Sequence, residues 1–299
     1  MSSTPTRSDV SKAVLITGCS TGIGRATAEH FVKNGWTTYA TARKPETLAE
    51  LERLGCHTLA LDVLDEDSMA AAVAEVERNE GAVGVLVNNA GYSLTAPIEA
   101  ASMADVRRQF DTNVFGLVRM AQLVLPGMRD QGWGRIVNLS SVGGKVTFPG
   151  MGFYHGTKYA VEAISDALRF EVRPFGVKVV LVEPGLIKTA FGDTATGHSA
   201  VAVDPSSPYA EFNEKVAEQV AGAYEGPMAM FATGPETVAK VIEKAVSSSR
   251  PRARYAVTFG AKATKLTHAM LPDAGWDLMM RAQFPQPAPV AVNGSTVSA

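Results

Sequence analysis

The stretch AVLITGCSTGIGRATAEHFVKNG, residues 13–35, decides the fold of this chain. It opens with the short apolar run 13–17, passes through three glycines and continues with the apolar spacing of an amphipathic helix. Gly18, Gly22 and Gly24 allow a tight turn in which backbone N–H groups approach an anion closely, and the helix that follows adds its positive N-terminal dipole. The order strand, glycine turn, helix therefore predicts a pyrophosphate site, with the spacing G-xxx-G-x-G in place of the more familiar G-x-G-x-x-G.

Short apolar runs alternate with helical patterns along the rest of the chain. Most of the runs are continuously apolar, which is typical of parallel strands that helices cover on both faces. The strand-like runs span 13–17, 37–42, 57–63, 83–90, 135–141, 178–184 and 254–259, and the clearest helical patterns span 24–35, 67–79, 103–130 and 153–173. The alternation predicts an α/β protein with a single Rossmann-like, doubly wound domain, in which helices flank a seven-stranded parallel sheet.

The domain is expected to cover residues 12–284. A flexible N-terminus, 1–11, is expected before it, and the tail 285–299, rich in proline and small residues, is predicted to be disordered. Residues 186–233 interrupt the β–α rhythm and contain an amphipathic piece at 209–224. Because long loops in compact domains tend to be lids or binding elements, we interpret this insertion as a substrate lid; a surface excursion without function is the alternative.

Composition excludes several classes of function. The chain has 299 residues and a net charge of -2, which gives no electrostatic footprint for nucleic acid or an anionic membrane. Its 2 cysteines and 5 histidines are scattered, so no metal site is expected. The polar start and the lack of a long apolar run predict neither a signal peptide nor a membrane span, and a cytoplasmic location is expected.

The end of the second predicted strand bears on the choice of cofactor. An acid there typically holds the 2′-hydroxyl of NAD(H), whereas arginine suits the 2′-phosphate of NADP(H). The sequence TTYATARKPE has no acid before Arg43 and Lys44, and Ser20 in the glycine turn offers a hydroxyl. These residues predict NADP(H) over NAD(H), although Arg43 and Lys44 could instead only solvate the start of a helix.

Tyr154 and Lys158 lie one turn apart in the helical pattern 153–173. Residues at i and i+4 share a helix face, so the phenol and the ammonium are expected to be neighbours. A free tyrosine has a pKa near ~10, too high for efficient acid/base chemistry at neutral pH, and a nearby ammonium lowers it. Taken alone, the pair is equally well explained by a packed tyrosine and a lysine that reaches to solvent.

Seven motifs decide between these interpretations because they occur in one order along 13–190. They are TGCSTGIG (17–24), LDV (61–63), NNAG (88–91), Asn113 in DTNVFG, LSS (139–141), the pair Tyr154-xxx-Lys158 and PGLIKT (184–189). Together they resemble the short-chain dehydrogenase/reductase family. The segments LITGCSTGIG, ATARKP and SVGGKVTFPGMGFYHGTKYAVE look closest to the branch that contains hydroxysteroid and retinol dehydrogenases.

The resemblance implies a role for each matching residue. Tyr154 would be the general acid/base, Lys158 would tune it and bind the nicotinamide ribose, and Asn113 would hold a water on the proton path. Ser141, rather than the adjacent Ser140, would orient the substrate oxygen. The residues expected to bind the cofactor are Gly18, Ser20, Thr21, Gly22, Ile23, Gly24, Arg43, Lys44, Asp62, Val63, Asn89, Ala90, Gly91, Tyr154, Lys158, Pro184, Gly185, Ile187 and Thr189.

The segments around the tyrosine suggest an apolar substrate pocket. The residues expected to bind substrate are Ser141, Val142, Phe148, Pro149, Met151, Tyr154 and Phe191, with Phe153, Phe212 and Met228 as further apolar candidates. His155 departs from the small residues that the family often has at this place. We do not expect it to be the catalytic base, because its side chain should point away from the face shared by Tyr154 and Lys158.

The sequence thus predicts an NADP(H)-dependent oxidoreductase that interconverts a hydrophobic secondary alcohol and its ketone, or an alcohol and an aldehyde. A catalytically silent NADP(H)-binding sensor or scaffold is the alternative, and an epimerase or dehydratase with an internal nucleotide is disfavoured by the glycine spacing. The resemblance further implies a homodimer or homotetramer that packs through 103–130 and 153–173.

Overall fold

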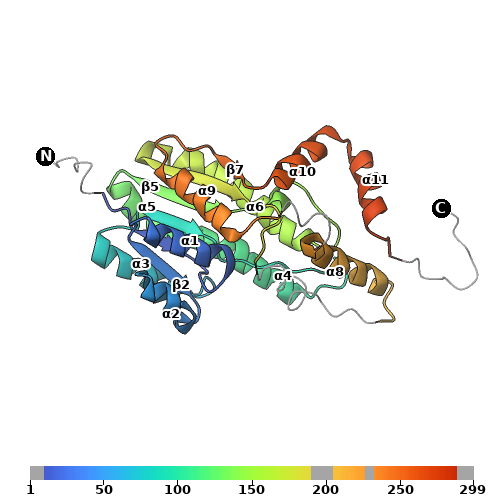
Figure 1. The fold of residues 1–299 in the computed structure, drawn as a ribbon, viewed down its shortest axis with the longest axis horizontal. Helices are drawn as coiled ribbons and strands as arrows, with labels where there is room; N and C mark the ends of the chain where they lie inside the picture. Colours follow the sequence, from blue (N-terminus) through green and yellow to red (C-terminus); the bar gives the residue numbers. More distant parts are fainter. Residues whose placement is uncertain (1–9, 190–204, 226–231, 288–299) are drawn as a thin grey trace, which may run out of the picture.

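Seven parallel strands form one sheet, as predicted, and their order in the sheet is β3-β2-β1-β4-β5-β6-β7 (Figure 1). The structure is a computed structural model and describes residues 10–189, 205–225 and 232–287. The strands are β1 (Val14–Ile16), β2 (Thr38–Ala42), β3 (His57–Ala60), β4 (Val85–Asn88), β5 (Gly134–Leu139), β6 (Val177–Glu183) and β7 (Arg254–Ala256). Each lies within or overlaps a predicted apolar run. The five inner strands are buried almost throughout, as expected where helices cover both faces, whereas the edge strands β3 and β7 are partly exposed.

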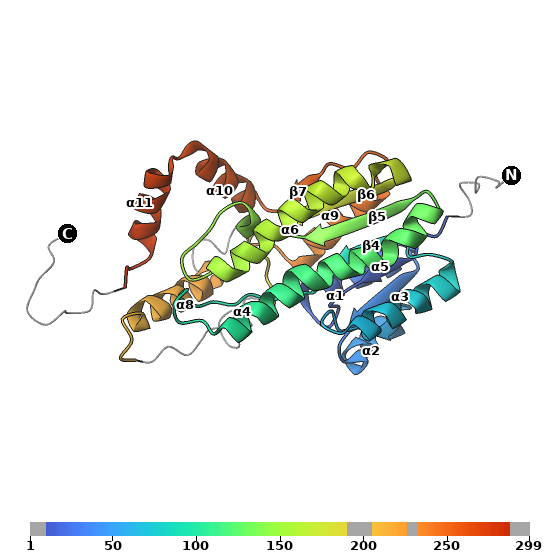
Figure 2. The same cartoon turned by 180° about the vertical axis from the view of Figure 1, so that it is seen from behind.

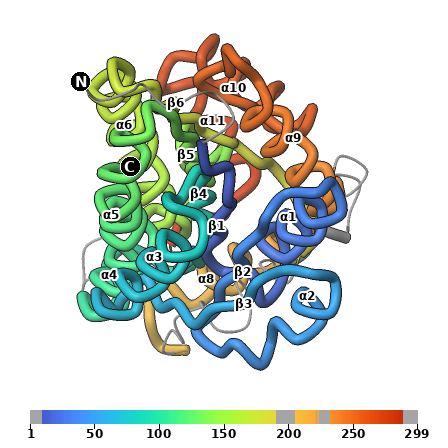
Figure 3. The backbone as a smooth tube through the Cα atoms, turned by 90° about the vertical axis from the view of Figure 1, so that its left-hand side faces the viewer, coloured from blue at the N-terminus to red at the C-terminus, as the bar shows by residue number. Residues whose placement is uncertain are grey.

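Two layers of helices cover the sheet, and the end-on view separates them (Figure 3). One layer contains α3 (Glu66–Glu80), α5 (Gly116–Asp130) and α6 (Gly152–Glu171); the other contains α1 (Gly22–Lys33), α2 (Ala49–Arg53) and α9 (Pro235–Ser247). Alternate residues of β1 serve the two layers: Leu15 belongs to the core with α3 and α5, and Val14 and Ile16 to the core with α1 and α9. This alternation follows from the two-residue period of a strand.

The strand order reverses at β1. It pairs with β2 on one side and with β4 on the other, so the chain crosses the sheet between β3 (residues 57–60) and β4 (residues 85–88). In doubly wound sheets ligands bind outside the carboxyl ends of the strands at such a switch point. The glycine turn leaves β1 at this end, which places the site there.

The predicted helix 103–130 contains one wider turn. It begins as α4 (Met103–Phe110), continues through the π-helical turn η2 (Asp111–Phe115) and ends as α5. The sequence predicted one uninterrupted helix here and did not indicate this turn. Figure 2 shows α4, α5 and α6 side by side on one face of the molecule.

The C-terminal part covers the end of the sheet where the site lies. Helices α8 (Ala210–Glu225), α10 (Phe259–Met270) and α11 (Asp273–Gln283) extend beyond the strands (Figure 1). The sequence predicted α8 but not the last two. Trp276 and Met280 of α11 pack on Val146 in a small separate core. Short 3-10 turns complete the described fold at η1 (Pro45–Leu48), η3 (Val142–Gly144) and η4 (Arg173–Phe175).

Candidate active site

A cavity of about 1410 Å³ lies at the carboxyl ends of the strands. It extends from the glycine turn after β1, past α6, to helices α8 and α10. Residues from the glycine turn and from the catalytic motifs thus line one space, although they are far apart in the sequence. Its volume is larger than the ~300–1,000 Å³ of typical small-molecule sites, as a nucleotide plus a substrate would require.

The glycine turn has the geometry of an anion cradle. Gly18 and Gly22 adopt φ of 74° and 60°, in the left-handed region that favours glycine. A Cβ on Gly24 would lie 2.3 Å from the Gly18 carbonyl oxygen, so only glycine allows this close approach of helix to turn. Helix α1 has no acidic residue in its first turn and Thr21 makes no side-chain cap, which suits a phosphate group at its N-terminus.

Most residues predicted to bind the cofactor line the cavity. They are Gly18, Ser20, Thr21, Gly22, Ile23, Arg43, Asp62, Val63, Asn89, Ala90, Gly91, Tyr154, Lys158, Pro184, Gly185, Ile187 and Thr189. Gly24 lies behind the turn, and Lys44 is exposed outside the lining. The Asn89 amide donates hydrogen bonds to the carbonyl oxygens of Thr17 (2.9 Å) and Gly18 (3.0 Å), so its side chain supports the turn.

Tyr154 and Lys158 project from the start of α6 and are each 7% exposed. The Lys158 ammonium lies 5.7 Å from the centre of the Tyr154 ring and donates a hydrogen bond to the Leu139 carbonyl oxygen at 2.8 Å. Burial lowers the pKa of Lys158 to about 8, and the Glu162 carboxylate acts in the opposite direction. The predicted pair is therefore brought together, with the lysine anchored to the end of β5.

Asn113 lies in the π-helical turn and is 1% exposed. Its Oδ1 accepts a hydrogen bond from the Tyr92 N–H at 3.0 Å, and its Nδ2 donates to the Tyr92 carbonyl oxygen at 2.8 Å and to the Thr157 hydroxyl at 3.1 Å. Asn113 does not line the cavity; it joins the loop after β4 to the helix of Tyr154. Turns of this kind often occur at functional sites.

Ser140 and Ser141 both line the cavity, at the junction of β5 and η3. The Ser141 hydroxyl accepts a hydrogen bond from the Gly143 N–H at 3.1 Å. A Cβ on Gly143 would lie 2.2 Å from Cδ2 of His155, so glycine lets this loop pack on α6. The Nδ1 of His155 accepts from the Phe148 N–H at 3.2 Å, and burial lowers the pKa of His155 to about 4. His155 is thus a neutral, structural side chain that nevertheless lines the cavity.

The substrate side of the cavity comes from four parts of the chain. Of the predicted residues, Ser141, Val142, Phe148, Pro149, Met151 and Tyr154 line it; Phe153 and Phe212 do not, and Phe191 and Met228 lie outside the described residues. Sequence reasoning missed the lining residues of the C-terminal half, which include Val216 and Val220 of α8, Ala261 and Thr264 of α10, and Gln283 and Phe284 at the end of α11. The amphipathic spacing of 209–224 was a signal for the residues of α8, and no comparable signal marked those of α10 and α11.

Comparison with known proteins assigns the family. Residues 12–199 match the family model described as short chain dehydrogenase, so the chain belongs to this family. An uncharacterized oxidoreductase, YbbO of Escherichia coli (strain K12), is 35% identical over 271 residues, which cover 90% of this chain and 94% of YbbO. The 3-ketodihydrosphingosine reductase of Bacteroides thetaiotaomicron is 42% identical over 181 residues, covering 60% of this chain and 65% of that protein.

A solved structure gives the same family fold. The structure of ElxO with NADP bound has a TM-score of 0.69 and 26% sequence identity, and the match covers 85% of this chain and 100% of that one. Fold and family together make the protein an oxidoreductase of the short-chain type with a site for a nicotinamide cofactor. The described residues hold no helix that could span a membrane and no His/Cys/Asp/Glu group suited to a metal ion.

Proposed function

We propose that the protein is an NADP(H)-dependent oxidoreductase that interconverts a hydrophobic secondary alcohol and its ketone, or an alcohol and an aldehyde. The observation that carries the proposal is the single cavity lined by the glycine turn, Ser141, Tyr154 and Lys158. It places a nucleotide cradle and a buried phenol–ammonium pair around one space, which is what hydride transfer coupled to proton transfer requires.

The residues present fit NADP(H). In this proposal the turn from Gly18 to Gly24 and the N-terminus of α1 hold the pyrophosphate, and Arg43 holds the 2′-phosphate, with Lys44 near it. Asp62 and Val63 contact the adenine, and Asn89, Ala90 and Gly91 line the cofactor. Pro184, Gly185, Ile187 and Thr189 hold the nicotinamide end. The cofactor, when bound, supplies or accepts the hydride.

Tyr154 moves the proton at its Oη. During reduction the phenol donates to the substrate oxygen, and during oxidation the phenolate accepts from the alcohol. The ammonium of Lys158 favours the phenolate, because an opposite charge stabilises the ionised form of an acid. The hydrogen bond from Lys158 to the Leu139 carbonyl oxygen fixes the ammonium beside the ring.

Ser141 and Asn113 complete the proposed machinery. The Ser141 hydroxyl orients the substrate oxygen and shares its developing charge. Asn113 fixes the loop after β4 against the helix of Tyr154, and a water held there would lead protons from Lys158 to solvent.

A hydrophobic substrate suits the lining of the cavity beyond Tyr154. Phe148, Pro149 and Met151 lie on one side of it and Val216 and Val220 of α8 on another. The relation to a 3-ketodihydrosphingosine reductase supports a ketone with a long apolar chain as one such substrate. We further propose that the insertion 186–233, which contains α8, is the substrate lid of a single domain covering 12–284.

A homodimer or homotetramer in the cytoplasm is the proposed state. Exposed aromatic side chains support packing between subunits through the helices of Figure 2: Phe115 is 60%, Tyr159 42% and Phe170 81% exposed. Size-exclusion chromatography with light scattering tests the assembly. A monomer at micromolar concentration would contradict it.

The proposed activity is tested by following the 340 nm absorbance of NADPH or NADH with a panel of hydrophobic ketones and aldehydes. Oxidation of NADPH in preference to NADH is expected, with faster turnover of the more apolar carbonyls. Binding of NADPH without turnover of any carbonyl would favour a sensor or scaffold, and a clear preference for NADH would contradict the role given to Arg43.

A further inference from the structure

One stripe of the catalytic helix carries four ionisable residues. Tyr154, Lys158, Glu162 and Asp166 follow one another at intervals of four along α6, so they share one face of the helix. The first two belong to the proposed chemistry. Glu162 and Asp166, which continue the stripe, have no role in the proposed chemistry, yet the Glu162 side chain is only 4% exposed. A carboxylate that deep in a protein needs partners.

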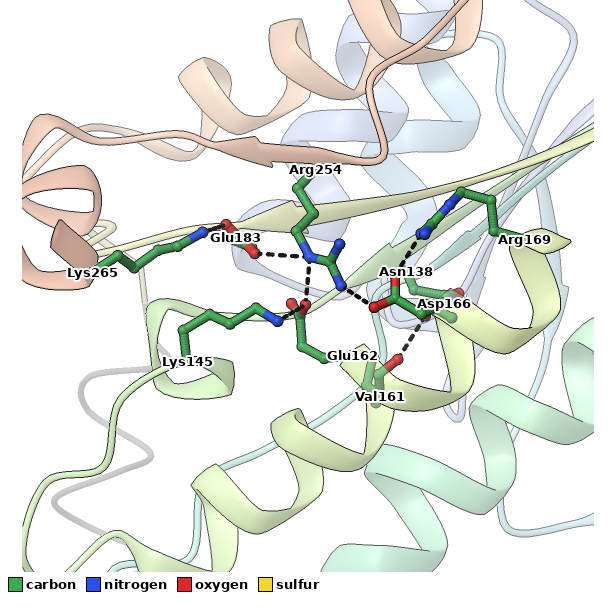
Figure 4. A network of polar contacts seen from close by, with 10 residues as sticks. Asn138, Lys145, Val161, Glu162, Asp166, Arg169, Glu183, Arg254 and Lys265 are labelled. Carbon is green, nitrogen blue, oxygen red and sulfur yellow. Dashed lines mark hydrogen bonds and ion pairs between the residues drawn. The ribbon is translucent and has the colours of Figure 1, made fainter. Parts of the chain in front are cut away.

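Glu162 has two cationic partners from different parts of the chain (Figure 4). Its Oε2 lies 2.8 Å from the Lys145 ammonium and 2.8 Å from Nε of Arg254, the first residue of β7. Arg254 also contacts Asp166 at 2.6 Å and lies 3.6 Å from Glu183. Glu183, at the end of β6, is fully buried and pairs with Lys265 of α10. Nη1 of Arg169 lies 2.5 Å from Oδ1 of Asp166.

The Lys145 contact ties the serine loop to α6. Ser140 to Lys145 form one short segment, and a Cβ on Gly144 within it would lie 2.6 Å from the Ser140 hydroxyl and 3.0 Å from Cγ of Glu162. The loop therefore packs directly on the Glu162 side chain, with Ser141 at its cavity end. A shift of Glu162 would move Ser141 relative to Tyr154.

Arg254 and Lys265 tie the C-terminal segment to the same point. Arg254 begins β7 and Lys265 lies in α10, whose Ala261 and Thr264 line the cavity. The catalytic helix, the serine loop and the cover of the substrate pocket thus meet at one cluster of charges.

We propose that Glu162 is a positioning residue of the active site, whose carboxylate holds the serine loop and the start of β7 against the helix that carries Tyr154 and Lys158. This inference rests on the proposed function, since it assigns Glu162 to the same reaction. Glu162 does not line the cavity and acts through its neighbours.

The charge of Glu162 also acts on Lys158. Burial lowers the pKa of Lys158, and Glu162 counteracts the shift. Burial likewise raises the pKa of Glu162, but Lys145, the neighbouring Ser140 hydroxyl and Arg254 outweigh it and hold that pKa below its usual value. Glu162 therefore stays ionised at neutral pH. The other charges around it are Asp166, Glu183 and, through them, Arg169 and Lys265.

The test compares Glu162→Gln with Asp166→Asn. Both substitutions remove one carboxylate that Arg254 contacts from the same stripe of α6, but only the first removes the contact with the serine loop and the charge next to Lys158. In Glu162→Gln the loss of the charge lets the pKa of Lys158 fall further. Because the proposed reaction needs Lys158 in its ammonium form, the pH at which kcat/KM falls on the alkaline side should be lower by about one unit, since nearby opposite charges shift pKa values by ~1–3 units. At pH 8.5 this corresponds to a loss of roughly eightfold, while Asp166→Asn should keep the wild-type limb.

A purely structural role would look different. If Glu162→Gln lowered Tm and reduced activity equally at all pH values, or left both unchanged, the proposal would be overturned. Titration of Lys158 by NMR of protein with ¹³C-labelled lysine, assigned with Lys158→Arg, needs no substrate. It should show the lower pKa in Glu162→Gln even if every carbonyl in the panel proves inert. If the pKa of Lys158 were the same in Glu162→Gln and wild type while the wild type oxidised NADPH normally, the role of Glu162 would be rejected and the proposed reaction kept. If the pKa shifted but the wild type turned over no carbonyl, the proposed reaction would be rejected and the effect of Glu162 on Lys158 kept.

Discussion

Substitution of Asn113 by alanine tests how the π-helical turn is held in this fold. Asparagine is a poor residue for a helix interior, and here it occupies a π-helical turn where its side chain makes three hydrogen bonds. Two of them pair the N–H and the carbonyl oxygen of Tyr92, and the third reaches Thr157 on the catalytic helix. Asn113→Ala removes all three without adding bulk.

The cost follows from the groups left behind. Thr157 keeps a partner, because its hydroxyl also donates to the Tyr154 carbonyl oxygen at 2.7 Å. The Tyr92 carbonyl oxygen also keeps one, because it accepts from Nε2 of Gln109 at 3.1 Å. Only the Tyr92 N–H loses its partner, in a part-buried place, and such a group costs about 1–3 kcal/mol. We therefore expect the free energy of unfolding to fall by about 1–3 kcal/mol, and kcat to fall because the loop after β4 no longer anchors the helix of Tyr154.

Urea unfolding followed by circular dichroism measures the first effect. Thr112→Ala is the matched control, because it removes one hydrogen bond, to the Arg108 carbonyl oxygen at 2.9 Å, from the adjacent residue. Its effect should stay within about 0.5 kcal/mol. If Asn113→Ala were no less stable than this control, the hydrogen bonds of Asn113 would not hold the turn, and the reasoning would fail.

Three further predictions follow from the site. Arg43→Ala should raise the Kd of NADPH by roughly 10–100-fold and leave that of NADH nearly unchanged, as measured by cofactor fluorescence, because only NADPH carries the 2′-phosphate; an equal loss for both would refute the assignment. Gly143→Ala should reduce turnover and cost about 1–3 kcal/mol, since its Cβ would collide with His155, whereas Gly222→Ala in α8, where a Cβ meets nothing within 4 Å, should not destabilise the protein. The folded-state pKa of His155 lies at about 4, below its ordinary value, so its contribution to stability is present above pH 6.5 and is lost as the pH falls toward 4. The difference amounts to about 3 kcal/mol, so His155→Asn should flatten the acid branch of urea midpoints against pH, and an unchanged branch would show that other groups cause it.

The sequence predicted those parts of the fold that have a local signal. The strands 85–88 and 177–183 contain the continuous apolar runs 85–87 and 179–182, and the spacing of the glycines indicates the tight turn. Helices α10 and α11 lack that clarity, because much of their apolar surface is exposed: Phe259 is 72%, Met270 74% and Leu278 69% exposed. What holds α11 is contact with a loop more than a hundred residues earlier, through Val146, which no local period encodes.

The residues of the site likewise fall into those that the sequence predicted and those that it did not. Tyr154 and Lys158 were predictable because helix geometry alone brings them together. The partners of Glu162 were not, since Lys145 comes from the serine loop and Arg254 from the last strand. Equally, Lys44 follows Arg43 but does not line the cavity, because the sequence does not show which way each side chain faces. Gly24 does not line it either, because it packs against the Gly18 carbonyl oxygen behind the turn.

The central claim, that Tyr154 is the acid/base of an NADP(H)-dependent reaction, is tested most directly by Tyr154→Phe. NADPH binding and NADPH-dependent turnover should be measured on the same preparation with the best carbonyl of the panel. The account predicts that the Kd of Tyr154→Phe for NADPH stays within a fewfold of the wild-type value. It predicts that kcat falls by about 10²–10⁴-fold, the usual contribution of a general acid. Turnover close to that of the wild type, with NADPH bound, would contradict it.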